Sequence, residues 1–179
     1  MVREPGRVLT QVRVYTGIHT PHRNAKQHGQ MQRRMIAWVA ESPETVEIFP
    51  RSLRYGIGRP PQEKGVDVEL AIDLVALALD NKFDIAVLAS ADTDLVPAVK
   101  FVTDRFADKT VVTLAYEPIE GCTCPAALDL PSGNVDRRAV TQRDFNRIAD
   151  KRNFYESASD VSAGLDPARV ERIRRRYDH

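Results

Sequence analysis

Residues 63–102 read EKGVDVELAIDLVALALDNKFDIAVLASADTDLVPAVKFV, and this stretch decides the fold class. Apolar residues recur at steps of three and four over residues 66–80, which predicts a helix. Residues 83–89 are a continuous apolar run between polar residues, which is typical of a strand buried on both faces. Residues 95–106 predict another helix. Pro97 is compatible with it, because proline falls in the first turn, where a missing N–H costs little.

The rest of the chain continues this alternation of helices and strands. Strands over residues 7–15 and 110–116 and helices over residues 30–40 and 141–148 are predicted. We also expect a short strand over 47–49 and loops over 16–29, 56–62 and 128–136. The alternation predicts an α/β fold with a parallel sheet. In such a sheet the functional site lies beyond the carboxyl ends of the strands.

Two aspartates follow the predicted strand 83–89 directly. They are Asp92 and Asp94, and Ser90 precedes them. Two carboxylates two residues apart at this edge of a sheet can bind one cation together. Asp94 could instead cap the following helix, but capping explains only one of the two residues. The pair therefore indicates a metal-binding or catalytic role.

A third carboxylate, Asp67, stands in the first turn of the predicted helix 66–80, just after Gly65. An acidic first turn also stabilises a helix through its dipole, so both a structural role and a ligand role stay open for this residue. Asp73 lies about 240° further round the helix, at 100° per residue, and cannot share a face with Asp67. We therefore give Asp73 only a supporting role.

The formal net charge of +1 conceals an uneven distribution. Residues 1–62 carry 10 Lys and Arg against 4 Asp and Glu, whereas residues 63–108 carry 4 against 10. Carboxylates concentrate divalent cations, and flanking basic residues neutralise phosphates, so a metal-dependent nuclease fits this distribution. On charge alone, solvated helix faces that differ in sign and carry no function are the preferred explanation.

Several classes of protein lack their sequence signals here. The 179 residues suffice for one domain with a core, and no apolar run is long enough to span a membrane. Residues 1–6 lack the apolar segment of a secretory signal, so we expect a soluble cytoplasmic protein with no membrane partner. Glycine motifs that bind phosphates or carry a catalytic serine are absent. Zinc sites require a characteristic spacing of their ligands. His19, His22 and His28 do not have this spacing, and neither do the two cysteines at 122 and 124.

Two motifs in this stretch resemble the NYN domain family of the PIN-like nuclease superfamily. One is K-G-V-D at the start of a helix, residues 64–67, and the other is S-x-D-x-D-L-x-P, residues 90–97. A buried strand is predicted between them, as in the family. The resemblance implies a Rossmann-like (PIN-like), mainly parallel sheet with helices on both faces. It also implies hydrolysis of RNA phosphodiester bonds with Mg²⁺ or Mn²⁺ as the cofactor.

Carried over to this chain, the catalytic and metal-binding carboxylates of the family correspond to Asp67, Asp92 and Asp94. Hard oxygen ligands suit Mg²⁺, which keeps several waters, one of which becomes the nucleophile. The substrate is expected to be single-stranded RNA. Its phosphates would be held by Lys64 or Arg59, and we group Ser90 with these two residues as a nucleic-acid contact. The protein could also form a homodimer, and the sequence leaves this open.

One element of the family pattern is missing. Members normally begin with an apolar strand that ends in an Asp, followed three residues later by an Asn, whereas this chain starts at what resembles the second strand. We therefore expect residues 1–152 to form an NYN domain without that strand and its Asp, and residues 153–179 to form a basic tail or helix. Either the recorded start lies downstream of the true one, or the centre of the sheet has a gap.

Three functions follow from these observations. The leading hypothesis is a metal-dependent ribonuclease. The missing Asp motivates the alternative, a weakly active or inactive RNA-binding or interaction module on the same fold. A third interpretation takes Asp92 as the nucleophile of a haloacid-dehalogenase-like phosphatase. That family carries its D-x-D motif on the first strand, whereas here the motif stands halfway along the chain.

Overall fold

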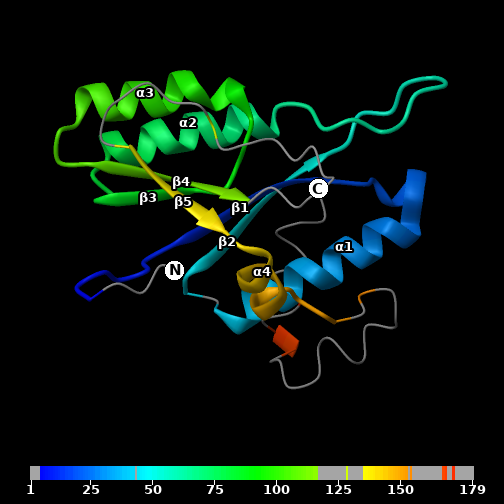
Figure 1. Ribbon diagram of the computed structural model, residues 1–179. Coiled ribbons are helices and arrows are strands. Elements are labelled where there is room, and N and C mark those ends of the chain that lie inside the picture. Colours follow the sequence, from blue (N-terminus) through cyan, green and yellow to red (C-terminus); the bar gives the residue numbers. More distant parts are fainter. Residues whose placement is uncertain are drawn as a thin grey trace. The chain divides into compact units, whose positions relative to one another are not determined.

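The structure is a computed structural model, which describes residues 5–42, 44–116, 128, 135–152, 154, 167, 168 and 171. The chain divides into two compact units (Figure 1). Unit 1 comprises Met1–Val66 and Arg152–His179, and unit 2 comprises Asp67–Lys151. Each unit contains a parallel sheet of its own, so we describe the units one at a time.

Unit 1 is built on two parallel strands, β1 (Val12–Ile18) and β2 (Val46–Ser52). The connection between them is the helix α1 (Pro21–Glu41), as parallel pairing requires a crossover rather than a tight turn. The helix and the two strands share a small apolar core, whose buried members are Ile18, Met35, Val39 and Ile48.

The predicted loop over residues 16–29 is wrong, because α1 begins at Pro21. Its first turn breaks at Asn24, whose backbone is not helical (φ −153°, ψ 79°). The Asn24 side chain then accepts a hydrogen bond from the backbone N–H of Gln27 at 3.1 Å, as an N-cap residue does. Proline and asparagine thus serve here as helix-start residues rather than as loop residues.

Unit 2 has a three-stranded parallel sheet in the order β3-β4-β5. The helices α2 and α3 lie along the same face of this sheet (Figure 1). Its elements are, in chain order, α2 (Val66–Leu79), β3 (Ile85–Leu88), the 3₁₀ turn η1 (Thr93–Leu95), α3 (Val96–Arg105), β4 (Thr110–Tyr116), β5 (Val135–Val140) and α4 (Gln142–Ile148).

The core of unit 2 lies between the helices and the sheet. The helices contribute Leu74 and Ala78 from α2 and Val99 and Val102 from α3, and the sheet contributes Leu88 and Val111. These side chains fix the helices against the strands, so the carboxyl end of β3 and the first turn of α2 have settled positions within the unit.

The expected α/β class with parallel strands is confirmed. Within the described residues the strands form two sheets, in which β1 pairs only with β2 and β3 only with β4. The prediction that residues 83–89 are buried on both faces is wrong, because Val87 is 43% exposed. Leu88 packs against α2 and α3, whereas Val87 on the opposite face is exposed.

Several predicted boundaries differ from the observed ones. The strand β4 and the helix α4 match closely, whereas the first strand begins at Val12 and not at residue 7. The strand β5 was missed, because its sequence VDRRAV carries three charges in six residues. The separate C-terminal segment 153–179 stays a prediction, since it falls largely outside the described residues. No described helix is long and apolar enough to cross a membrane.

A buried lysine ties the end of α2 to the start of β4. Lys109 is 1% exposed, and its ammonium donates hydrogen bonds to Asn81 Oδ1 at 2.6 Å and to the Phe83 carbonyl oxygen at 3.1 Å. The rings of Phe83 and Phe106 lie 5.6 and 5.8 Å from the ammonium. Asp108 completes the charge balance at 3.6 Å. These partners stabilise the buried charge of the Lys109 ammonium.

Replacement of this lysine is expected to destabilise unit 2. Lys109→Ala should lower the free energy of unfolding by about 3 kcal/mol, because it opens a cavity and leaves two part-buried acceptors unpaired. Urea denaturation measures the change. The exposed Lys100 on α3 supplies the control, and Lys100→Ala should change stability by less than about 0.5 kcal/mol. Equal effects of the two substitutions would contradict the role given to Lys109.

The N-terminus of α4 is closed by a reciprocal pair of hydrogen bonds. The Thr141 hydroxyl accepts from the backbone N–H of Asp144, and the Asp144 carboxylate accepts from the backbone N–H of Thr141. The Thr141 hydroxyl also donates to Asp144 Oδ2 at 2.7 Å. These bonds, the side-chain one first, and the charge of Arg147 lower the pKa of Asp144 below its usual value.

The lowered pKa predicts how the capping contribution depends on pH. Because the folded state favours the charged carboxylate, the contribution is present above the unfolded pKa of about 4 and is lost as the pH falls through the lower folded pKa. Asp144→Asn should therefore flatten the fall in stability below about pH 4. Denaturation at a series of pH values measures this, and an unchanged pH profile would contradict it. Thr141→Val should raise the pKa of Asp144 toward its usual value in an NMR titration.

Candidate metal centre

Asp67 is placed by the start of α2. It is the second residue of the helix, and Gly65 just before the helix has φ +79°, a left-handed conformation that favours glycine. The side chain of Asp67 is half-buried. Its position follows from the packing of α2 on the sheet, so it is fixed by the core of unit 2 and not by a flexible loop.

Asp92 and Asp94 are placed by a short chain of hydrogen bonds after β3. The Asp92 backbone N–H donates to Ser90 Oγ at 3.2 Å, and the Asp94 backbone N–H donates to Asp92 Oδ1 at 3.0 Å. Asp92 is thereby the N-cap of η1, and the fully buried Leu95 anchors the other end of this turn. Both carboxylates stand at the carboxyl end of β3, as the sequence predicted.

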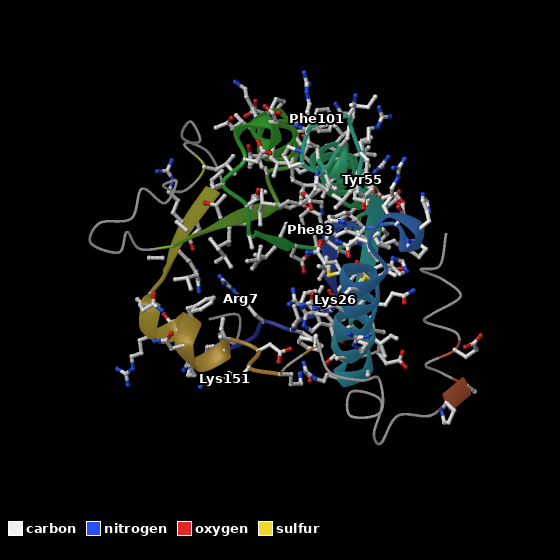
Figure 2. The ribbon with its side chains drawn as sticks, turned by 90° about the vertical axis from the view of Figure 1, so that its right-hand side faces the viewer. Arg7, Lys26, Tyr55, Phe83, Phe101 and Lys151 are labelled. Carbon is white, nitrogen blue, oxygen red and sulfur yellow. The ribbon has the colours of Figure 1, made fainter. Side chains whose placement is uncertain are left out.

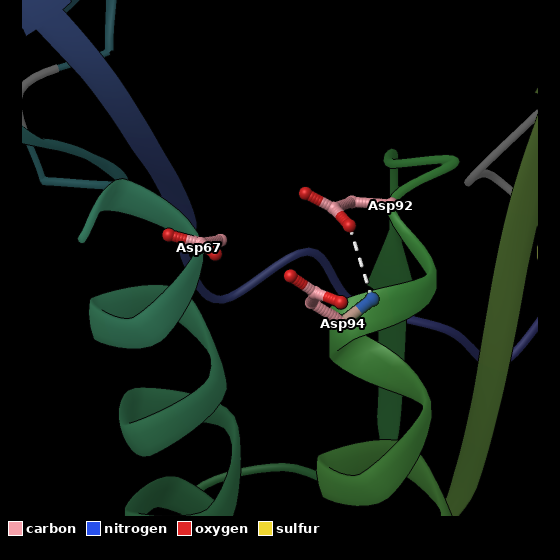
Figure 3. Close-up of side chains that lie close together, drawn as sticks. All are labelled: Asp67, Asp92 and Asp94. Carbon is pink, nitrogen blue, oxygen red and sulfur yellow. Dashed lines mark hydrogen bonds between the residues drawn. The ribbon is translucent and has the colours of Figure 1, made fainter. Parts of the chain in front are cut away.

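The three carboxylates converge, although 25 residues separate Asp67 from Asp92 in the sequence. One oxygen of each lies within 4.8 Å of one oxygen of the others. Figure 3 shows Asp67 on the first turn of α2, opposite Asp92 and Asp94, with the hydrogen bond between the latter two dashed. Asp92 and Asp94 are exposed to solvent. The site is therefore accessible to an ion and to a substrate.

No basic side chain neutralises this group within the part of the chain that the structure describes. Asp67, Asp92 and Asp94 form no ion pair there, in contrast to Asp144, which pairs with Arg147. Three like charges at this spacing repel one another, by about 1 kcal/mol per pair even in bulk water. The arrangement thus favours a cation among the oxygens, and the donor set fits a hard divalent ion.

The dimensions of the group suit a small ion after side-chain rotation. Ligands at about 2.1 Å from Mg²⁺ can lie at most about 4.2 Å apart, on opposite sides of the ion. Only one pair among three ligands can lie opposite, and adjacent octahedral ligands lie about 3.0 Å apart. Oxygens within 4.8 Å of one another therefore need to close by up to about 1.8 Å, which rotation of the exposed Asp92 and Asp94 side chains can supply. Three carboxylates leave further coordination positions for water or for a phosphate oxygen.

The other predicted site residues have different surroundings. Ser90 is half-buried, and its hydroxyl fixes the backbone of Asp92. Lys64 and Arg59 belong to unit 1 and are exposed. Asp73 is half-buried on α2 and does not belong to the carboxylate group, in agreement with the helical geometry.

The histidines are not part of a metal-binding group in the described residues. His19 instead forms a hydrogen bond with Tyr55, a residue that the sequence analysis overlooked. The available signal was an aromatic residue between arginines in the segment RSLRYGIGR, residues 51–59. The two cysteines at 122 and 124 lie outside the described residues.

Comparison with known proteins identifies the family. A search of curated proteins and a search of solved structures give no match. The family model described as the NYN domain matches residues 2–127, which is well over half of the chain and includes all three aspartates of the candidate metal centre. The family has a PIN-like nuclease fold, in accordance with the parallel strands and the acidic group found here. The chain belongs to the NYN domain family.

Proposed function

We propose that this protein is a metal-dependent ribonuclease that hydrolyses RNA phosphodiester bonds, with Mg²⁺ or Mn²⁺ held by Asp67, Asp92 and Asp94. One observation carries the proposal, namely the convergence of three carboxylates without a basic partner in the described residues. Membership of a family with a nuclease fold supports it.

The local hydrogen bonds indicate which carboxylate oxygens are available to a cation. Asp92 Oδ1 is held by the backbone N–H of Asp94, which leaves its other oxygen to face a cation. Asp94 makes no side-chain hydrogen bond in the described residues, so both of its oxygens are available to an ion or to a water. Asp67 approaches from a rigid helix. A bound divalent ion supplies an activated water and neutralises charge on the phosphate.

RNA as the substrate is supported by the charge distribution. Residues 63–108 hold the acidic excess, and the preceding 62 residues hold a basic excess that can neutralise phosphates. Arg59 and Lys64 are exposed and carry their charges in solvent, as phosphate contacts require. Ser90 contributes by positioning Asp92.

Metal binding should be visible as a change in stability. Mn²⁺ at about 100 times its dissociation constant should raise the free energy of unfolding by about 2.7 kcal/mol. Asp94→Asn should remove this gain and should leave the metal-free protein at least as stable as the parent, because one repelling charge is lost. Thermal denaturation with Mn²⁺ and with EDTA measures both effects. A parent protein indifferent to Mn²⁺ would contradict the metal site.

Cleavage of labelled single-stranded RNA tests the proposed activity itself. We expect cleavage with Mn²⁺, none with EDTA, and a loss of at least about 100-fold in Asp94→Asn because charge stabilisation by the ion is lost. Asp104→Asn on α3 removes an equally exposed carboxylate outside the group and should keep full activity. Full activity in folded Asp94→Asn would exclude this assignment of the catalytic centre.

A second candidate function is a non-catalytic RNA-binding or interaction module. Residues 5–40, which include β1, contain no Asp or Glu, so this segment adds no carboxylate to Asp67, Asp92 and Asp94. This candidate predicts RNA binding that persists in EDTA, depends on salt and leads to no cleavage. Strictly metal-dependent hydrolysis of RNA would exclude it.

A further inference from the structure

A second polar group lies in unit 1, at the carboxyl end of β1. It consists of His19, Arg23, His28 and Tyr55, which we call the aromatic-basic cluster. The Tyr55 hydroxyl and His19 Nδ1 form a hydrogen bond at 2.8 Å, and His28 Nδ1 donates to the His19 carbonyl oxygen at 2.6 Å. The Arg23 guanidinium lies over the Tyr55 ring, 5.6 Å from its centroid. The hydrogen bonds thus fix one aromatic ring among three basic side chains.

The segment that carries Tyr55 is held rigidly at its base. The backbone N–H of Leu53 donates to the Ile18 carbonyl oxygen at 2.9 Å, and Arg54 and Gln62 exchange two backbone hydrogen bonds at 2.9 Å each. The backbone N–H of Gly17 donates to Glu63 Oε1 at 2.8 Å.

Glycine at position 17 leaves room for the side chains of Leu53 and Glu63, which would have to shift to admit a Cβ. A Cβ there would lie 2.5 Å from Leu53 Cδ2 and 2.6 Å from Glu63 Oε1, closer than real Cβ atoms come to other atoms. The residues at the two ends of the segment therefore pack directly against the β1 backbone. A ring held in this way loses little conformational entropy when a ligand binds.

The surroundings of the cluster in the sequence are free of acidic residues. No Asp or Glu occurs in residues 5–40 or 48–62, and the nearest acid, Glu63, is engaged by Gly17. Arg51, Arg54 and Arg59 add exposed positive charge to the same segment of chain as Tyr55. Figure 2 shows Tyr55 with nitrogen-bearing side chains around it, and also labels Lys26 on α1. Positive charge beside an aromatic ring favours the binding of a polyanion that carries planar groups.

The cluster offers two kinds of contact. Arg23 is exposed and can donate to phosphate oxygens. His19 Nε2 makes no hydrogen bond within the described residues, and it adds a second donor when His19 Nδ1 accepts from the Tyr55 hydroxyl. The Tyr55 ring is half-buried and offers a surface for stacking. Nucleotides of single-stranded RNA combine a phosphate with an unstacked base, whereas acidic peptides lack the planar group.

We propose that the aromatic-basic cluster binds one nucleotide of single-stranded RNA, with the base against Tyr55 and a phosphate at Arg23. The proposal rests on the proposed function only in that the bound strand is taken to be the substrate of the candidate metal centre.

The test measures binding of a fluorescently labelled oligouridine by anisotropy, with Asp94→Asn protein in EDTA so that no strand is cut. Tyr55→Ala should weaken binding about tenfold, as loss of one base-stacking contact does. Tyr55→Phe and Tyr55→Trp keep a ring for stacking but lose the hydroxyl that bonds His19, so both should bind more weakly than the parent and more tightly than Tyr55→Ala. Arg23→Ala should reduce the slope of log K against log salt by about 0.7, the loss of one phosphate contact.

A matched control exists on α3. Arg105 lies over the ring of the exposed Phe101, 5.9 Å from its centroid, so Phe101→Ala removes an aromatic ring of similar surroundings outside the cluster. It should leave binding unchanged. If circular dichroism showed that Tyr55→Ala is poorly folded, the salt dependence of RNA binding by Arg23→Ala would still test whether the cluster binds a phosphate.

The outcomes separate this inference from the proposed function. Binding that depends on Tyr55, without cleavage by the parent protein in Mn²⁺, would support the cluster and reject the ribonuclease. Cleavage together with binding indifferent to Tyr55 and Arg23 would overturn the cluster and leave the ribonuclease standing. Absence of RNA binding, with Tyr55-dependent binding of a labelled polyglutamate peptide, would replace RNA by an acidic protein partner and overturn the proposal.

Discussion

The hydrogen bond from the Asp94 backbone N–H to Asp92 Oδ1 organises the candidate metal centre. It closes the turn after β3, directs the two carboxylates outward together and starts the segment that becomes α3. Leu95, buried beneath the turn, supplies the apolar contact that keeps this geometry. The packing of the core of unit 2 thus holds three carboxylates together against their electrostatic repulsion. A divalent cation would offset the repulsion that remains.

The fold could be predicted where the sequence signal is local and strong. The strand β4 (TVVTLAY) is rich in β-branched and apolar residues, and α2 is apolar with few interruptions, so the type of each element could be predicted from its own residues. The start of α1 could not be predicted in this way, because Asn24 acts as a cap only in combination with the turn at Thr20. The exposure of Val87 was equally hidden, since it follows from α2 and α3 packing on the other face of the sheet and not from the strand's own sequence.

The same distinction applies to the two functional groups. Asp92 and Asp94 were predicted because they follow a strand whose carboxyl end the fold class makes the functional edge, and Asp67 was added by the resemblance to the NYN family. Tyr55 was not, because its role depends on a hydrogen bond to His19, 36 positions earlier in the chain. Neither sequence spacing nor composition records a contact of that kind. Aromatic residues within acid-free basic segments are the signal to examine in related chains.

Paramagnetic broadening by Mn²⁺ tests most directly whether one ion joins α2 to the turn after β3. Unpaired electrons broaden NMR signals only close to the ion, so the amide signals of the chain show where it binds. We expect one equivalent of Mn²⁺ to broaden the amides of residues 66–68 and 91–95 together, with saturation at one ion per chain. Broadening of only one of these segments, or broadening spread over the chain without saturation, would contradict the central claim that three aspartates form a single metal site.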